Sequence, residues 1–344
     1  MKVLVVGGAG YIGSHMVLTL MEAGHEIIVL DDLSSGHEEA VLGGEFVAGT
    51  LEDSKLLDGM LADRRPDAVM HFASFIQVGE SVEQPAKYYR NNLTNTMNLL
   101  DAMVRHRVLR FVFSSTAAIF GKSDDPITED HPKNPINPYG RSKWMVEQVL
   151  QDYDRAYDLK SCCLRYFNAA GADPLARIGE GHDPESHLIP LLLQAASGRR
   201  TSISVFGRDY PTPDGTCMRD YIHVLDLCSA HLLALDELER TARSAVYNLG
   251  NGEGFSVQEV IDAVRTVTGK PLKIVEAARR PGDRARLVAD STRARERLGW
   301  KPRYADLRQI VQHAWQWEQK LAGLEAPGVP HEDHQPAVRP VSRI

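Results

Sequence analysis

The chain has 344 residues, of which 43% are hydrophobic and 25% charged, a composition that excludes collagen-like, coiled-coil and largely disordered proteins. It carries a formal charge of −7 without a basic stripe, so we expect neither nucleic acid nor a membrane surface as a partner. No apolar run approaches the roughly 20 residues that span a bilayer, and the apolar start lacks a signal-peptide cleavage pattern. Cys162, Cys163, Cys217 and Cys228 show no C-x-x-C spacing. We therefore expect buried, reduced thiols, no metal site and a cytoplasmic location.

Short apolar, β-branched runs alternate with amphipathic helical stretches in the first half of the chain. The predicted strands, in chain order, are Val3–Val6, Glu26–Asp31, Glu45–Ala48, Asp67–Ala73, Arg110–Ser115 and Ser161–Phe167. Runs that are apolar on both faces and separated by helices require right-handed crossovers and a mainly parallel sheet. The sequence predicts an α/β fold, with a Rossmann-type doubly wound parallel sheet over residues 1–170.

The pattern changes after residue 170 into a polar, loop-rich region with shorter elements. The elements predicted there are helix His187–Ser197, strand Ser202–Phe206, helix Val224–Leu238, strand Ala245–Leu249, helix Ser256–Thr268, strand Leu272–Glu276 and helices near Ser291–Leu298 and Tyr304–Leu321. We expect residues 171–322 to form mainly a smaller α+β substrate-binding lobe, with some segments returning to the first domain. The polar, proline-punctuated residues 323–344 are predicted to be a loosely ordered tail.

A glycine-rich turn directly follows the first predicted strand. Gly7, Gly10 and Gly13 are spaced G-x-x-G-x-x-G before a predicted helix. Such glycines allow a tight turn, close approach of the backbone to a pyrophosphate and tight helix–strand packing. Asp31 lies 18 residues past Gly13, where a carboxylate accepts the ribose 2′-hydroxyl, and with Asp32 it would repel a 2′-phosphate. The pattern predicts bound NAD rather than NADP; the alternative is a tight turn before a solvated acidic strand end.

Tyr139 and Lys143 lie four residues apart in a predicted helix that begins with Asn137 as its N-cap and Pro138 at the first helical position. They share one helix face, so the ammonium can stabilise a phenolate and lower the pKa of the tyrosine. The preceding strand ends in three hydroxyl residues, and the last, Thr116, can relay a proton or anchor a reacting hydroxyl. The pattern predicts Tyr139 as a general base for a sugar hydroxyl. The alternative is a packed tyrosine beside a solvated lysine.

Together these motifs resemble the extended branch of the short-chain dehydrogenase/reductase family, and within it the UDP-glucose 4-epimerases, to about residue 320. The matching segments are Gly7–His15, His71–Ala73, Val78–Val82, Tyr88-Tyr89, Asn91-Asn92, Ser114–Gly121, Asn137–Lys143, Arg165–Asn168, Phe206-Gly207, Asp209–Thr212, Asp214–Thr216, Arg219–Val224 and Arg279–Asp283. The resemblance implies an NAD-dependent isomerase that interconverts UDP-glucose and UDP-galactose through a 4-keto sugar. It also implies a homodimer paired through helices Pro85–Arg105 and Pro138–Tyr157.

The resemblance also implies roles for individual residues. Tyr139 is the base, Lys143 its electrostatic partner and ribose ligand, and Thr116 occupies the family's Ser or Thr position. The other implied cofactor contacts are Gly7, Gly10, Tyr11, Ile12, Gly13, Asp31, Asp32, Leu51, Phe72, Ala73, Ser74, Asn91, Ser114 and Tyr166. The implied substrate contacts, besides Thr116, are Asn168, His187, Leu188, Phe206, Arg219, Tyr221, Arg280 and Asp283.

Arginines suit a diphosphate and an acid suits ribose hydroxyls, so the implied substrate set is chemically reasonable. For Arg219 and Arg280 the alternative is a surface ion pair with Asp220 or Asp283.

Several positions depart from the family's pattern. Ile76 stands where some members carry lysine, Thr50 and Leu51 stand where an Asp-Ile or Asp-Leu pair often meets adenine, and His187 replaces an asparagine. Leu287 stands where residue bulk is associated with admitting an N-acetyl group, and leucine is intermediate. An epimerase of UDP-N-acetylglucosamine and UDP-N-acetylgalactosamine, or of another nucleotide sugar, is therefore kept as an alternative.

Other reaction classes on the same fold are less favoured. Nucleotide-sugar dehydratases and decarboxylases carry acid/base groups directly after the Ser or Thr, whereas this chain has Ala117 and Ala118. A non-catalytic dinucleotide sensor often loses its Tyr/Lys pair, and this chain retains both residues.

Overall fold

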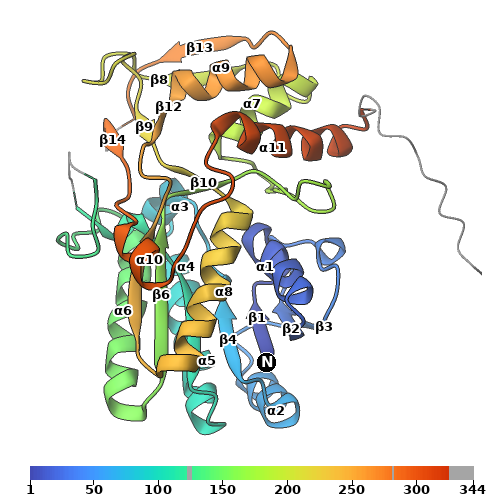
Figure 1. The fold of residues 1–344 in the computed structure, drawn as a ribbon, viewed down its shortest axis with the longest axis vertical. Coiled ribbons are helices and arrows are strands. Elements are labelled where there is room, and N and C mark those ends of the chain that lie inside the picture. The colour runs from blue at the N-terminus through green and yellow to red at the C-terminus, as the bar shows by residue number, and fades with distance from the viewer. Residues whose placement is uncertain (122–125, 281–282, 325–344) are drawn as a thin grey trace, which may run out of the picture.

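The computed structural model describes residues 1–121, 126–280 and 283–324. Its largest sheet has the strand order β11-β6-β5-β4-β1-β2-β3, and every neighbouring pair is parallel (Figure 1). The strands are β1 Lys2–Val6, β2 Glu26–Asp31, β3 Glu45–Ala48, β4 Ala68–His71, β5 Arg110–Thr116, β6 Lys160–Tyr166 and β11 Ala245–Leu249. The order runs outward from β1 in both directions, which confirms the predicted Rossmann-type, doubly wound α/β fold.

Helices cover both faces of this sheet (Figure 1). On one face lie α1 Tyr11–Glu22 and α8 Val224–Thr241, which share a hydrophobic core with the strands. On the other face lie α2 Ser54–Arg64, α5 Asn95–Arg105 and α6 Pro138–Tyr157, around a second core. Because both faces are covered, the inner strands consist of continuous apolar runs rather than alternating ones.

The helix predicted over Pro85–Arg105 is interrupted in the structure. It consists of α4 Pro85–Tyr89, the π-helical turn η2 Arg90–Thr94 and α5. Such turns are frequent at functional sites, where they change the direction of side chains. This turn contains Asn91, a predicted cofactor contact, and its neighbour Asn92. The helix is therefore interrupted at a position where we expect the cofactor to bind. The helix predicted over Pro138–Tyr157 has the predicted bounds.

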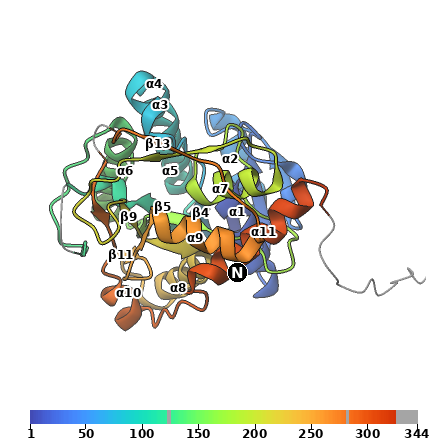
Figure 2. The same ribbon diagram turned by 90° about the horizontal axis from the view of Figure 1, so that it is seen from above.

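A smaller lobe lies beyond the carboxyl ends of the large sheet's strands, and from above its helices cross over those ends (Figure 2). Its helices α7 Leu188–Ser197, α9 Val257–Thr268 and α11 Leu307–Leu321 share a hydrophobic core with short strands. The short pairs are β7 Asn168–Ala170 with β10 Tyr221–His223 and β8 Ile203–Phe206 with β13 Ile274–Ala277, and β9 Met218–Arg219 lies between β12 Phe255–Ser256 and β14 Arg286–Leu287. The remaining helices are α3 Val78–Glu83, α10 Thr292–Arg297, η1 Glu38–Ala40 and η3 Ala117–Ile119.

The domain built on the large sheet is not continuous in the sequence. Strand β11 belongs to that sheet and α8 packs against it, although both follow residue 170. All four cysteines are buried and free, as predicted. Among the described residues, no helix has the length and apolar character needed to cross a membrane. Of the predicted tail, residues 325–344 lie outside the described residues.

Candidate active site

The turn between β1 and α1 leaves no room for a side chain at Gly7 or at Gly13. Gly7 has φ +79°, and a Cβ there would lie 2.5 Å from the backbone nitrogen of Ala73. A Cβ on Gly13 would lie 2.0 Å from the Gly7 carbonyl oxygen. Gly10 is the N-cap of α1 and no side chain caps this end, so the first N–H groups of the helix are available to an anion. The turn therefore fits the pyrophosphate of a dinucleotide.

Asp31, at the end of β2, lies against this turn. Its Oδ2 accepts a hydrogen bond from the Ala9 nitrogen at 2.9 Å, and its Oδ1 accepts one from the Leu33 nitrogen at 2.9 Å. Burial raises the pKa of Asp31, and the two backbone hydrogen bonds partly offset the shift. Asp32 is exposed and accepts from the Ser34 nitrogen at 2.9 Å. Of the two predicted acids, Asp31 is therefore the one held at the glycine turn.

The first turn of α6 lies directly against the chain that follows β5. Asn137 caps the helix, since its side chain accepts a hydrogen bond from the Gly140 nitrogen at 2.8 Å. A Cβ on Gly140 would lie 2.4 Å from the Ala118 carbonyl oxygen. Only a glycine allows this approach, which brings Tyr139 to the carboxyl end of β5 beside Thr116.

Lys143 lies one helical turn after Tyr139 and is buried. Its Nζ donates to the Ser74 Oγ at 2.7 Å and to the Ser114 carbonyl oxygen at 2.8 Å. Burial lowers the pKa of Lys143 to about 7, and the negative charge of Glu147 opposes the shift. The predicted residues Lys143, Ser74 and Ser114 are thus joined in one network.

The Tyr139 hydroxyl needs neighbouring groups that lower its pKa if it is to act as a base. Burial raises its pKa, and the side chain of Thr116 partly offsets this shift. The Thr116 Oγ1 accepts a hydrogen bond from the Ala118 nitrogen at 3.1 Å, so its own proton is free for another acceptor. Positive charge placed beside the phenol would lower its pKa further.

Two more predicted cofactor residues, Phe72 and Tyr166, lie with Ser114 where β4, β5 and β6 end. The hydroxyls of Ser114 and Tyr166 are hydrogen-bonded to each other. The rings of Phe72 and Tyr166 both lie beside His231, with centroids 5.0 and 6.1 Å from its ring. His231 was missed at the sequence level because it lies on the buried, apolar side of α8, like any core residue.

One member of the asparagine pair in η2 is fully buried. It is Asn92, and the predicted contact of Asn91 with the cofactor stays a prediction. The Asn92 side chain accepts from the Phe75 nitrogen at 3.0 Å and donates to the Phe75 carbonyl at 3.0 Å and to the Ser142 Oγ at 3.2 Å. Asn91 donates to the Asn92 Oδ1 at 3.0 Å. Asn92 therefore joins the loop after β4 to α6, and the doubled asparagine was its sequence signal.

A buried ion pair between Glu147 and Arg165 supports the site. The sequence did not predict it. The Glu147 carboxylate accepts from Arg165 Nε at 2.9 Å and from Arg165 Nη2 at 2.5 Å. The Ser115 Oγ donates to Glu147 Oε1 at 2.5 Å. Because Glu147 is one turn past Lys143 and Arg165 is on β6, the pair fixes α6 against β5 and β6.

Four of the predicted substrate residues lie on short strands of the smaller lobe, namely Asn168 on β7, Phe206 on β8, Arg219 on β9 and Tyr221 on β10. Arg219 Nη2 lies 3.2 Å from Asp283 Oδ1, the ion pair considered as the alternative for this arginine. The Arg280 guanidinium lies 3.9 Å from the centre of the Phe206 ring, a cation–π contact. Leu287 in β14 is paired in register with Arg219 in β9. The residue linked to sugar size therefore lies beside the predicted diphosphate ligand.

The remaining predicted substrate residues of this lobe are Asn168, Tyr221, Leu188 and His187. Asn168 and Tyr221 are paired in register between β7 and β10, and Leu188 is the first residue of α7. The His187 ring contacts Glu180 and Glu185, and its predicted contact with the substrate stays a prediction.

Two further positions bear on the predicted contacts. The side chain of Asp220, the other candidate partner of Arg219, points inward and accepts from the backbone nitrogens of Asn251, Gly252 and Ala289. Leu51 packs its side chain into the core beneath β1, so its predicted contact with adenine stays a prediction.

Three comparisons with known proteins agree. Residues 3–250 match the model of the NAD dependent epimerase/dehydratase family. Over 321 residues, which are 93% of this chain and 96% of the relative, the chain is 51% identical to the UDP-glucose 4-epimerase of Halalkalibacterium halodurans. It is also similar to a crystal structure of a UDP-glucose 4-epimerase, with a TM-score of 0.92 and 49% identity over 95% of this chain and 100% of that one. The Brucella ovis UDP-glucose 4-epimerase in complex with NAD gives a TM-score of 0.90 and 47% identity over 92% and 98%.

Proposed function

The chain belongs to the NAD-dependent epimerase/dehydratase family, and from this premise we propose that it interconverts UDP-glucose and UDP-galactose. The observation that carries the proposal is the meeting of Tyr139, Thr116 and the buried Lys143 beside the glycine turn. A sequence 51% identical to a UDP-glucose 4-epimerase over 93% of this chain supports the same substrate pair.

The glycine turn and Asp31 would hold the cofactor. The uncapped N-terminus of α1 would hold the pyrophosphate, and the carboxylate of Asp31 would accept a hydrogen bond from a ribose hydroxyl. Lys143 would donate a hydrogen bond to the other ribose. Bound NAD supplies a reversible hydride acceptor for the carbon that is epimerised.

The chain's own residues move the proton. Tyr139 takes the proton of the sugar 4-hydroxyl, directly or through Thr116, and returns it when the 4-keto sugar is reduced on its other face. Lys143 lies one turn away, and in its protonated form it would oppose the rise in the pKa of Tyr139 that burial causes. Because the sugar regains both the hydride and the proton that it gave up, the cycle has no net oxidation.

The smaller lobe anchors the UDP part while the keto sugar turns over. Arg219 and Arg280 offer guanidinium groups to the diphosphate, and Asp283 offers an acceptor to the ribose. In this proposal the contact of Arg219 with Asp283 is a resting arrangement that the diphosphate replaces. The residues 1–170 together with α8 and β11 form the NAD-binding part, and 171–322 form mainly the substrate lobe.

The protein also acts as a homodimer in the cytoplasm, in this proposal. The helices expected to pair, α5 and α6, carry the exposed apolar residues Met97 and Met145. Four reduced cysteines suit a reducing compartment. Light scattering that gives the mass of one chain would refute the dimer.

Incubation of the purified protein with UDP-galactose, without added cofactor, tests the reaction. We expect UDP-glucose to form, and we expect Tyr139→Phe to lose about 10²–10⁴-fold in rate, because the general base is removed. Tyr157→Phe, an exposed tyrosine on the same helix, is the matched control and keeps full activity. No conversion even after NAD is supplied, or full activity of Tyr139→Phe, would refute the proposal.

A further inference from the structure

Four potential metal ligands converge in the segment that leads into α7. Glu180, His182, Glu185 and His187 each offer one ligand atom, and these atoms all lie within 4.8 Å of one another. His182 Nδ1 is 3.0 Å from Glu180 Oε1 and 3.9 Å from Glu185 Oε2. His187 Nδ1 is 2.7 Å from Glu180 Oε1 and 3.2 Å from Glu185 Oε1. Each imidazole nitrogen thus faces both carboxylates.

These distances match the spacing that a small tetrahedral ion imposes on its ligands. Nitrogen and oxygen ligands lie about 2.0–2.1 Å from Zn²⁺, so two of them are about 3.3 Å apart in a tetrahedral site. The four nitrogen–oxygen distances, from 2.7 to 3.9 Å, lie on both sides of that value. Small rotations of side chains would be enough to form the site.

The contact between His187 and Glu180 is close but is not a well-formed hydrogen bond. The Nδ1 atom of His187 is shielded from solvent and, among the described residues, has no aligned hydrogen-bond partner, although Glu180 Oε1 is 2.7 Å away. Two polar atoms that are near one another but misaligned can both point at a third position. A cation between them would satisfy both.

The charges of the cluster favour a divalent cation. The side chains of Glu180 and Glu185 are only 6% and 5% exposed, and two buried carboxylates need compensating positive charge. An M²⁺ ion with two neutral imidazoles and two carboxylates gives a neutral site. Imidazole ligands favour transition metals, whereas Mg²⁺ and Ca²⁺ prefer oxygen alone.

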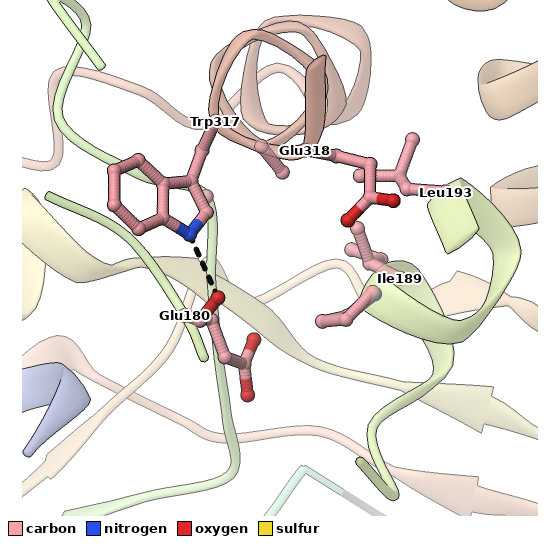
Figure 3. Close-up of a pocket in the computed structure, with 8 residues that line it drawn as sticks. Glu180, Ile189, Leu193, Trp317 and Glu318 are labelled. Carbon is pink, nitrogen blue, oxygen red and sulfur yellow. Dashed lines mark hydrogen bonds between the residues drawn. The ribbon is translucent and has the colours of Figure 1, made fainter. Parts of the chain in front are cut away.

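The backbone of the cluster is held in place from two directions. Trp317 Nε1 on α11 donates to the Glu180 carbonyl at 2.8 Å, as Figure 3 shows. The His37 ring contacts the Gly181 carbonyl at 2.9 Å from the large-sheet side. Glu180 also lines a small hollow of about 20 Å³ between α7 and α11 (Figure 3). The backbone of the segment is therefore held by contacts from both lobes.

We propose that Glu180, His182, Glu185 and His187 bind a divalent transition-metal ion, with Zn²⁺ the best match to the ligand set. The His187 side chain then holds the ion rather than the substrate. The site takes no part in the proposed reaction, and its role is to tie the start of α7 to the glycine turn. The Tyr11 ring, whose hydroxyl donates to the Gly171 carbonyl at 2.7 Å, lies 6.3 Å from the His182 ring.

The test measures metal binding by the full chain after treatment with a chelator. Equilibrium dialysis against Zn²⁺ followed by elemental analysis is expected to give one ion per chain at micromolar Zn²⁺. Co²⁺ is the spectroscopic probe, and its visible absorption reports the coordination geometry. His182→Gln and Glu185→Gln are each expected to weaken binding at least about 10-fold and to remove the Co²⁺ spectrum, because loss of a ligand costs no less than loss of a residue that merely orients one.

The matched control is His106→Gln, which changes a histidine paired with Asp58 at 3.0 Å on a remote surface. It is expected to bind Zn²⁺ as the wild type does. Circular dichroism of the metal-free variants checks that they fold. The Co²⁺ spectrum of the wild type tests the site even if a variant does not fold.

Three results would overturn the assignment: no binding by the wild type, binding only at millimolar Zn²⁺, or equal binding by the ligand variants. Epimerase activity is assayed separately on the same preparations. Activity without metal binding refutes only the metal site, and metal binding without activity refutes only the proposed reaction.

Discussion

Neutralising Glu147 tests the buried ion pair beneath the catalytic helix. Glu147→Gln keeps the shape of the side chain but leaves the Arg165 guanidinium without its counter-charge. The two side chains are 1% and 3% exposed, so Arg165 cannot turn to water. Its one other hydrogen-bond partner among the described residues is the Glu129 carbonyl at 3.3 Å.

The expected cost follows from this burial. Breaking a buried pair by removing one partner destabilises a protein by about 3–5 kcal/mol, since the remaining charge stays desolvated. The hydrogen bond from Ser115 to Glu147 Oε1 is weakened as well. We therefore expect Glu147→Gln to lower the free energy of unfolding by about 3–5 kcal/mol.

Urea unfolding, followed by circular dichroism and tryptophan fluorescence, measures the change. The matched control is Asp152→Asn, which breaks an ion pair with Arg155 on the same helix whose side chains are 76% and 77% exposed. An exposed pair contributes about 0–1 kcal/mol. The double variant Glu147→Leu with Arg165→Met leaves no unpaired charge, and we expect it to regain most of the lost stability.

Two results would refute this reasoning. One is a Glu147→Gln variant no less stable than Asp152→Asn. The other is a double variant as unstable as Glu147→Gln alone, which would mean that the shape of the pair matters and not its charge.

Two further predictions concern backbone space and pH. Gly13→Ala is expected to lower stability by about 1–3 kcal/mol and to release NAD, because the new Cβ would lie 2.0 Å from the Gly7 carbonyl; Gly59→Ala, with nothing within 4 Å, should stabilise by about 0.5–1 kcal/mol. Thermal melts and the NAD content of the purified proteins check this, and similar melts for the two variants would contradict it. Burial raises the pKa of Asp220 from 3.8 to about 6, so its protonated form stabilises the fold at low pH and that contribution is lost as pH rises through 6. Asp220→Asn should lack this pH dependence between about pH 4 and 6, and parallel melting curves against pH for variant and wild type would contradict it.

The elements around the site were predictable because their patterns are local. The two-sided apolar runs predicted the six strands of the first half to within one or two residues at most ends, since burial on both faces requires such runs. The glycine spacing and the i, i+4 pair Tyr139 and Lys143 were predictable for the same reason. A turn and a helix face are set by neighbouring residues.

The helix over Pro85–Arg105 shows the limit of this reasoning. The family resemblance implied one continuous helix there, whereas the structure has a π-helical turn in Arg90–Thr94. The turn is compensated by the hydrogen bonds of Asn92 to Phe75 and Ser142. Those partners come from other segments, which no local pattern identifies.

The sequence by itself determined the parallel sheet, the dinucleotide turn and the Tyr139 and Lys143 pair, because each depends on residues a few positions apart. Only the tertiary structure decided which side chains support them. Glu147 meets Arg165 because α6 packs across β6. Glu180, His182, Glu185 and His187 lie close in sequence but in an irregular segment, where no period sets side-chain directions. Their convergence depends on Trp317 and His37, which hold the backbone from two different lobes.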